Sequence, residues 1–160
     1  MTARELWEEF SRKTGINADY DEWAFCGGGE IGDELAQLVF EGKKTATASA
    51  YIAYQTENEP LPQAGEYSVV LFDSGEAACI IRNVRVSLVP FKKVPAEHAY
   101  CEGEGDRSLE YWRRVHREAF EPDYAAAGLP FDEDGLCVLE EFELVYSGAP
   151  YARNSSDIYG

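Results

Sequence analysis

The sequence predicts an α+β fold in which a small, partly closed β-barrel is flanked by helices. Stretches of alternating apolar and polar residues, typical of strands, are interleaved with stretches of helical period, without regular strand–helix alternation. The 160 residues, of which 45% are hydrophobic, form one domain with enough chain to bury a core. With so few strands, closure of the sheet is the natural way to protect the strand edges.

The N-terminal third predicts two helices and one strand. Apolar residues at helical spacing predict a helix over residues 4–13. A second helix is predicted to start with Asp33 as its N-cap and to end before Gly42. Small and β-branched residues then predict a strand over residues 45–54.

The middle of the chain predicts a β-hairpin with strands over residues 67–72 and 77–89. In its second strand Val84, Val86 and Leu88 alternate with polar residues, so we expect one buried face there. A short helix opened by Pro95, an amphipathic helix capped by Ser108 and a closing strand over 136–146 complete the elements.

The composition restricts the function. Thirty acidic and fourteen basic residues give a formal charge of −16, which argues against binding of duplex nucleic acid by bulk charge. No apolar run approaches the ~20 residues of a membrane span, and the N-terminus lacks a secretory signal. We therefore expect a cytoplasmic protein with four reduced cysteines and no membrane partner. Cysteine and histidine spacings do not fit zinc, so neither a metal nor a cofactor is expected.

The few basic residues are unevenly placed, which leaves two interpretations open. Several lysines and arginines fall before residue 94, with a cluster over residues 82–93. They would form either a local cationic face or a solvated surface of mixed charge.

The glycine-rich segment Gly27–Gly32 matches the letter of a dinucleotide-binding loop ahead of a helix. Glu30, Asp33 and Glu34 would place carboxylates where a pyrophosphate must sit. The sequence therefore disfavours a nucleotide phosphate site there.

Lys44 and Thr47 form the most informative pair. A hydroxyl becomes nucleophilic when a nearby base takes its proton, and a neutral lysine can serve, given desolvation or a neighbouring cation such as Lys43. Because residues i and i+3 of a straight strand point to opposite faces, Lys44 must lie in the turn before the strand if its amine is to reach Thr47. The alternative is a solvated lysine that complements a helix C-terminus and a threonine that favours a strand.

Glu102 ends a short helix at a glycine-flanked loop, a good position for a general acid or an orienting carboxylate, although a surface acid is the plainer interpretation. His116 lies on an apolar stripe and is predicted to be a core histidine with a hydrogen-bond partner. His98, which is close to Glu102 in the sequence, is the second histidine to test for a role in catalysis. Cys26 and Cys101 lack the basic neighbours that would produce a thiolate.

Over Trp23 to Tyr146 the chain resembles the ASCH-domain family of the PUA-like superfamily, in its longer bacterial subgroup. The resemblance is carried by motifs distributed along the chain: Gly42-x-Lys44-Thr45-x-Thr47, Gly65, Val89-Pro90-Phe91, Ala99-x-x-Glu102-Gly103, Trp112-x-x-x-His116 and Phe142-x-Leu144-Val145. It implies a PUA-like barrel and divides the chain into an N-terminal helical extension (1–22), an ASCH-like domain (23–147) and a C-terminal tail (148–160).

The resemblance also implies a nucleotide-facing cleft and a chemistry. Shorter relatives act as amidohydrolases on N4-acylated cytidine with a lysine, a threonine and a glutamate, which fall on Lys44, Thr47 and Glu102. In the predicted reaction Thr47 attacks the amide carbonyl, Lys44 is the base, and Glu102 protonates or orients the departing amine. In a variant, Lys44 and Glu102 activate water and Thr47 only binds. The alternatives are an RNA-binding module or ribonuclease, and a non-catalytic nucleoside sensor. A homo-oligomer is compatible with each of these functions.

Overall fold

The computed structural model describes residues 1–148, so the predicted tail, 148–160, lies outside the described residues except for Gly148. The elements are α1 (Ala3–Thr14), β1 (Tyr20–Trp23), η1 (Phe25–Gly27), α2 (Gly29–Phe40), β2 (Ala46–Ala50), α3 (Tyr51–Glu57), β3 (Tyr67–Leu71), β4 (Ala77–Pro90), η2 (Phe91–Lys93), α4 (Ala96–Glu102), α5 (Leu109–Ala126) and β5 (Leu136–Tyr146). In this part of the chain no helix is both long and apolar enough to cross a membrane.

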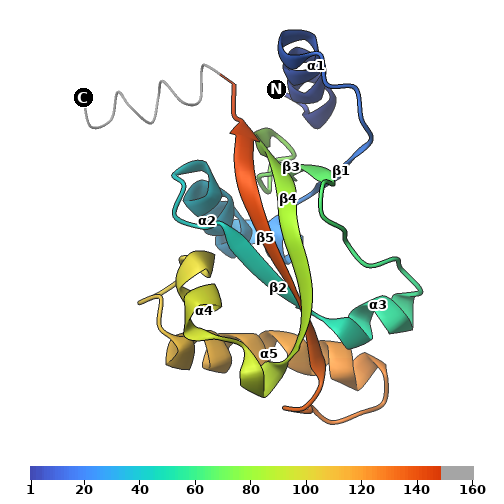
Figure 1. The fold of residues 1–160 in the computed structure, drawn as a ribbon, viewed down its shortest axis with the longest axis vertical. Helices are drawn as coiled ribbons and strands as arrows, with labels where there is room; N and C mark the ends of the chain where they lie inside the picture. The colour runs from blue at the N-terminus through green and yellow to red at the C-terminus, as the bar shows by residue number, and fades with distance from the viewer. Residues whose placement is uncertain (149–160) are drawn as a thin grey trace. The chain divides into compact units, whose positions relative to one another are not determined.

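The strands form a mixed five-stranded sheet in the order β1-β3-β4-β5-β2 (Figure 1). Strand β1 runs parallel to β3, whereas β3 pairs with β4, and β2 with β5, in antiparallel fashion. Strands β1 and β2 are the two edges, so the sheet is not closed. The α+β class with a partly closed sheet is therefore confirmed.

Within the described residues the chain divides into two compact units, and the first comprises residues 1–43, 65–83 and 142–148. The predicted N-terminal helix is present as α1, which Thr2 caps with its side chain. Its apolar face, including Leu6 and Phe10, is buried with Val69 of β3 and Ile80 of β4. The helical extension thus contributes to the core of this unit.

The second unit comprises residues 44–64 and 84–141 and contains every predicted site residue. Helices α4 and α5 both contact β2 (Figure 1). Ala50 of β2, Ala99 of α4 and Trp112 of α5 share one buried cluster. Small alanines on β2 allow the two helices to approach the strand closely.

The second helix begins earlier than predicted, and Asp33 is not its cap. Helix α2 starts at Gly29, whose N–H donates to the Asp73 carboxylate at 2.8 Å. Asp33 lies inside the helix and accepts a hydrogen bond from the Asp73 N–H at 2.7 Å. The Asp73 carboxylate therefore occupies the helix N-terminus, where a nucleotide phosphate would have to bind, in agreement with the sequence argument.

Two other expectations are corrected. The strand predicted over 45–54 ends at Ala50, because its partner β5 begins at Leu136 and Ala50 already pairs with Cys137. Without further strand partners the chain turns into α3. In β4, Val84 and Leu88 are exposed, whereas the buried residues lie mainly in the first half of the strand. Alternation indicates two different faces but does not specify what covers either of them.

Candidate functional site

Lys44 lies immediately before β2 and is buried, with only 1% of its side chain exposed. The Thr45 N–H donates to the carbonyl of Cys101 at 2.8 Å, which fastens the start of β2 to the C-terminal end of α4. The Lys44 ammonium then reaches the last residue of that helix: its Nζ is 3.2 Å from Glu102 Oε1 and 3.5 Å from the Glu102 carbonyl oxygen. Lys44 thus precedes the strand, as a contact with Thr47 would require, but its ammonium contacts Glu102 instead.

Glu102 is equally buried and is surrounded by hydrogen-bond donors. Its Oε1 faces Lys44 Nζ and His116 Nε2, the latter at 3.3 Å. Its Oε2 faces His98 Nε2 at 3.0 Å and accepts from the Trp112 indole N–H at 2.6 Å. Two donors on each oxygen fill the accepting capacity of a carboxylate, which explains how this charge can be buried.

His116 lies between a backbone carbonyl and the Glu102 carboxylate. Its Nδ1 is 2.9 Å from the carbonyl oxygen of Trp112 and its Nε2 faces Glu102. The ring stacks on the Trp112 indole, with centroids 4.2 Å apart and planes 15° apart. His116 is thus the buried, hydrogen-bonded histidine that the sequence predicted.

Glu104 is the second carboxylate at Lys44, and sequence reasoning missed it. Its Oε2 lies 2.7 Å from Lys44 Nζ. The Lys44 ammonium therefore pairs with both carboxylates, which lowers the cost of burying these charges. The signal that could have indicated it is the glycine on either side, at 103 and 105, which marks a loop built to present one side chain.

The same residues raise the question of a metal ion. Glu102, Glu104 and His116 each bring one potential ligand atom within 4.8 Å of the others. The Lys44 ammonium, however, already contacts both carboxylates. A lysine amine thus supplies the cation that this cluster needs, and a metal at the same position would be repelled by it.

The ionisation of Glu102 predicts how stability depends on pH. Burial by itself raises the pKa of this carboxyl, but the Lys44 ammonium and hydrogen bonds from His116 and His98 hold its pKa well below the ordinary value of 4.5. A lowered folded-state pKa stabilises the protein above about pH 4.5, and this contribution is lost as pH falls toward the folded value. We expect the difference in unfolding free energy between the wild type and Glu102→Gln to be constant over about pH 5–7 and to shrink below about pH 4.5. Urea titrations across this range measure it, and a difference unchanged down to about pH 3 would contradict the assignment.

Thr47 is placed differently from Lys44 and Glu102. It lies on β2 opposite Glu140 of β5 and is half-buried. Successive residues of a strand point to opposite faces, so Thr47 points away from the face on which Ala48 and Ala50 pack against the buried cluster of Trp112. Within residues 1–148 its hydroxyl makes no hydrogen bond. The structure therefore brings Lys44 and Glu102 into contact, and leaves the Thr47 hydroxyl available without a contact to either.

Comparison with known proteins assigns the chain to a family. A family model described as the ASCH domain matches residues 21–146. The chain belongs to the ASCH domain family. Its fold is similar to the crystal structure of an ASCH domain from Lactobacillus crispatus JV V101, with 31% identity, a TM-score of 0.83, and 89% of this chain and 93% of that chain covered. A protein from Enterococcus faecalis V583 is 34% identical with a TM-score of 0.83, over 96% of this chain and 91% of that one. The comparison with curated proteins finds no match.

The basic residues of this ASCH domain do not form a bare cationic face over 82–93. Arg82 lies 3.0 Å from Glu143, Arg85 forms an ion pair with Glu141, and Lys92 forms one with Asp134. Three of the four cations in this segment, all but Lys93, are thus matched by a carboxylate. Of the two interpretations, these pairs support a surface of mixed charge.

The thiols of the domain form no disulfide among the described residues. Burial raises the pKa of Cys79 to about 12, and burial together with the charge of Glu102 does the same for Cys137. Thiols held in this state are poor nucleophiles at neutral pH.

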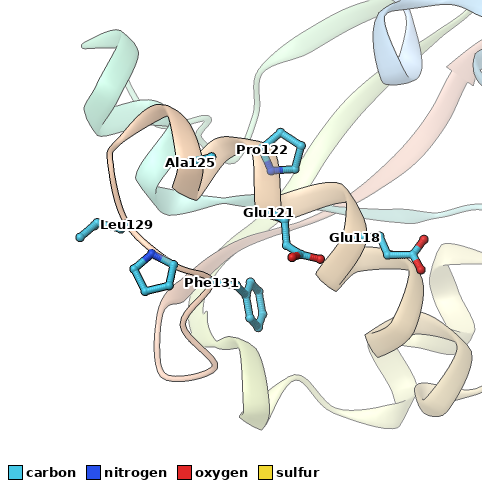
Figure 2. A pocket seen from close by; sticks show the side chains of 7 residues that line it. Glu118, Glu121, Pro122, Ala125, Leu129 and Phe131 are labelled. Atoms are coloured by element: carbon cyan, nitrogen blue, oxygen red, sulfur yellow. The ribbon is translucent and has the colours of Figure 1, made fainter.

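A separate hollow of about 520 Å³ lies along the C-terminal half of α5 and the segment that follows it (Figure 2). Figure 2 shows the Glu118 and Glu121 carboxylates on the helix and the Phe131 ring on that segment. The hollow is lined by Glu118, Glu121, Pro122, Ala125, Leu129, Pro130 and Phe131. None of the predicted site residues lines it, so we do not assign the chemistry of the ASCH domain to this hollow.

Proposed function

We propose that this ASCH domain is an amidohydrolase that acts on a small N-acylated pyrimidine nucleoside such as N4-acetylcytidine. The observation that carries the proposal is the burial of Lys44 between Glu102 and Glu104. Charged groups are rarely buried unless they are paired, and such groups are concentrated at functional sites. The lysine and glutamate of the family resemblance are the two residues that form this contact.

The proposed reaction breaks the bond between the acyl carbon and the exocyclic nitrogen. A nucleophile adds to the carbonyl carbon, the Lys44 ammonium stabilises the negative charge that develops on the carbonyl oxygen, and the nitrogen leaves as an amine. Glu102 was expected to act either as a general acid or as an orienting carboxylate. Because both of its oxygens already accept hydrogen bonds, we assign it the orienting role: it holds Lys44 in place. A small neutral nucleoside is not repelled by the net charge of −16, whereas a long RNA is.

The identity of the nucleophile separates two forms of this proposal. Nζ of Lys44 donates toward the Glu102 carboxylate, the Glu102 carbonyl and Glu104, so the amine is charged and holds no lone pair for the Thr47 proton. The Thr47 hydroxyl makes no contact with it. These observations favour attack by water, with the Thr47 hydroxyl serving to bind substrate.

Thr47→Val, which keeps the shape of the side chain and removes the hydroxyl, tests this choice. If water attacks, kcat should fall less than about tenfold and KM should rise by about 5–10-fold, the loss of one hydrogen bond. If Thr47 is the nucleophile, turnover should vanish and an acyl group should be trapped on Thr47 in the wild type, visible by mass spectrometry. The assay is the release of acetate and cytidine from N4-acetylcytidine, and Thr56→Val, at an exposed position of α3, is the matched control.

The proposal as a whole depends on the wild-type result. Turnover of N4-acetylcytidine or a related acylated pyrimidine nucleoside supports it, and its absence with every such substrate contradicts it. An RNA-binding role would instead appear as RNA affinity that falls with increasing salt. Ligand-induced thermal stabilisation without turnover would indicate a nucleoside sensor.

A further inference from the structure

Glu104 is the most accessible charged member of the Lys44 network. Its side chain is 17% exposed, against 1% for both Lys44 and Glu102 and 10% for His116. A substrate that approaches this network from solvent therefore meets Glu104 before it meets Glu102.

The two glutamates also differ in their capacity to accept a proton. Both oxygens of Glu102 are occupied by donors from Lys44, His116, His98 and Trp112. Glu104 uses Oε2 for Lys44, and within residues 1–148 its Oε1 makes no hydrogen bond. A carboxylate with a free oxygen facing solvent can take a proton from water, whereas a carboxylate with four donors around it cannot do so without losing one of them.

We propose that Glu104 is the general acid–base of this site: it takes a proton from the attacking water and passes it to the departing amine. This inference rests on the proposed amidohydrolase function. As the oxygen of water bonds to the acyl carbon, Glu104 receives one water proton and becomes a neutral carboxylic acid. When the carbon–nitrogen bond breaks, Glu104 returns that proton to the nitrogen. The products are a carboxylic acid and the free exocyclic amine, and Glu104 is again ionised.

The loop around Glu104 holds its backbone in a defined position. Gly103 and Gly105 both have positive φ angles, +72° and +58°. A Cβ atom on Gly105 would lie 2.4 Å from the Tyr111 ring, so the loop packs directly against α5. The Arg107 N–H donates to the Glu104 carbonyl at 2.9 Å, and the Arg107 guanidinium stacks over the Tyr100 ring at 3.7 Å. These backbone contacts hold the loop beside Lys44. Within residues 1–148 the Glu104 side chain makes one hydrogen bond, which it accepts from the Lys44 ammonium.

The test compares Glu104→Gln with the wild type in full-length protein, with N4-acetylcytidine as substrate over about pH 5–9. We expect kcat to fall about 10²-fold or more, with KM changed less than about threefold and the pH profile of kcat flattened on its acidic side. Glu104→Ala should regain part of its kcat in added formate, a small carboxylate that can replace the missing group. Glu110→Gln, an exposed acid in the first turn of α5, should match the wild type.

Each outcome is informative. If the wild type turns over and Glu104→Gln keeps its kcat within about threefold, the role of Glu104 is wrong while the amidohydrolase function stands. If the variant is inactive, its melting temperature has dropped and formate restores nothing in Glu104→Ala, Glu104 only supports the structure and the inference is also wrong. If the wild type itself turns over no acylated pyrimidine nucleoside, the proposed function fails first, and the role of Glu104 fails with it.

Discussion

Replacing Lys44 by methionine is expected to lower kcat/KM for N4-acetylcytidine by about 10³-fold or more. Methionine resembles the stem of lysine in length but brings no charge to the developing oxyanion. A preorganised cation in a site shielded from water contributes more than the same charge in solution, because fewer water dipoles screen it. The measurement is steady-state hydrolysis at pH 7 with purified wild type and variant.

Lys43→Met is the matched control for this substitution. Lys43 is the adjacent residue and has a similar side chain, but 61% of it is exposed and its ion pair with Glu41 is 3.8 Å long. We expect its activity to stay within about twofold of the wild type, because exposed pairs of this kind contribute little. Circular dichroism at the assay temperature establishes that Lys44→Met is folded. A folded Lys44→Met protein with wild-type turnover would remove Lys44 from the mechanism.

The second large effect is on stability: Glu102→Gln should lower the unfolding free energy at pH 7 by about 3–5 kcal/mol. The amide has nearly the shape of the carboxylate. In the variant, however, an NH₂ group stands where the wild type has an oxygen that accepts from two donors. Whichever way the amide turns, its N–H groups face either Lys44 and His116 or His98 and Trp112. The substitution therefore breaks hydrogen bonds and leaves the buried ammonium with less negative charge around it.

For a chain of this length the loss corresponds to a fall in melting temperature of roughly 6–20 °C. Glu97→Gln is the control, since Glu97 lies exposed in the first turn of the same helix, α4, and should change stability by less than about 0.5 kcal/mol. Urea denaturation of both variants measures the difference. A Glu102→Gln protein as stable as the control would mean that the network around Glu102 contributes no more than a surface acid.

These predictions separate two kinds of contribution at one site. Glu102 is fully engaged with protein donors, so its removal should be felt mainly in stability and through the position of Lys44. Glu104 is partly exposed and has an oxygen to spare, so its removal should be felt mainly in kcat. Comparison of the two isosteric glutamine variants thus distinguishes a positioning carboxylate from one that exchanges protons with substrate.

The sequence by itself determined the elements whose signals are local. The first helix, the Ser108 cap and period of α5, and the closing strand β5 depend on residues a few positions apart, and these elements appear where they were predicted. The family motifs likewise indicated Lys44 and Glu102.

Only the tertiary structure decided what depends on distant partners. The end of β2 at Ala50 is set by where β5 begins, and Asp33 lies inside α2, where it accepts a hydrogen bond from the Asp73 N–H instead of capping the helix. The accessible carboxylate beside Lys44 comes from Glu104, because the fold brings residues sixty positions apart to 2.7 Å. Hydrogen bonds and ion pairs act over a few ångströms in space, and spacing along the chain does not specify which side chains meet there.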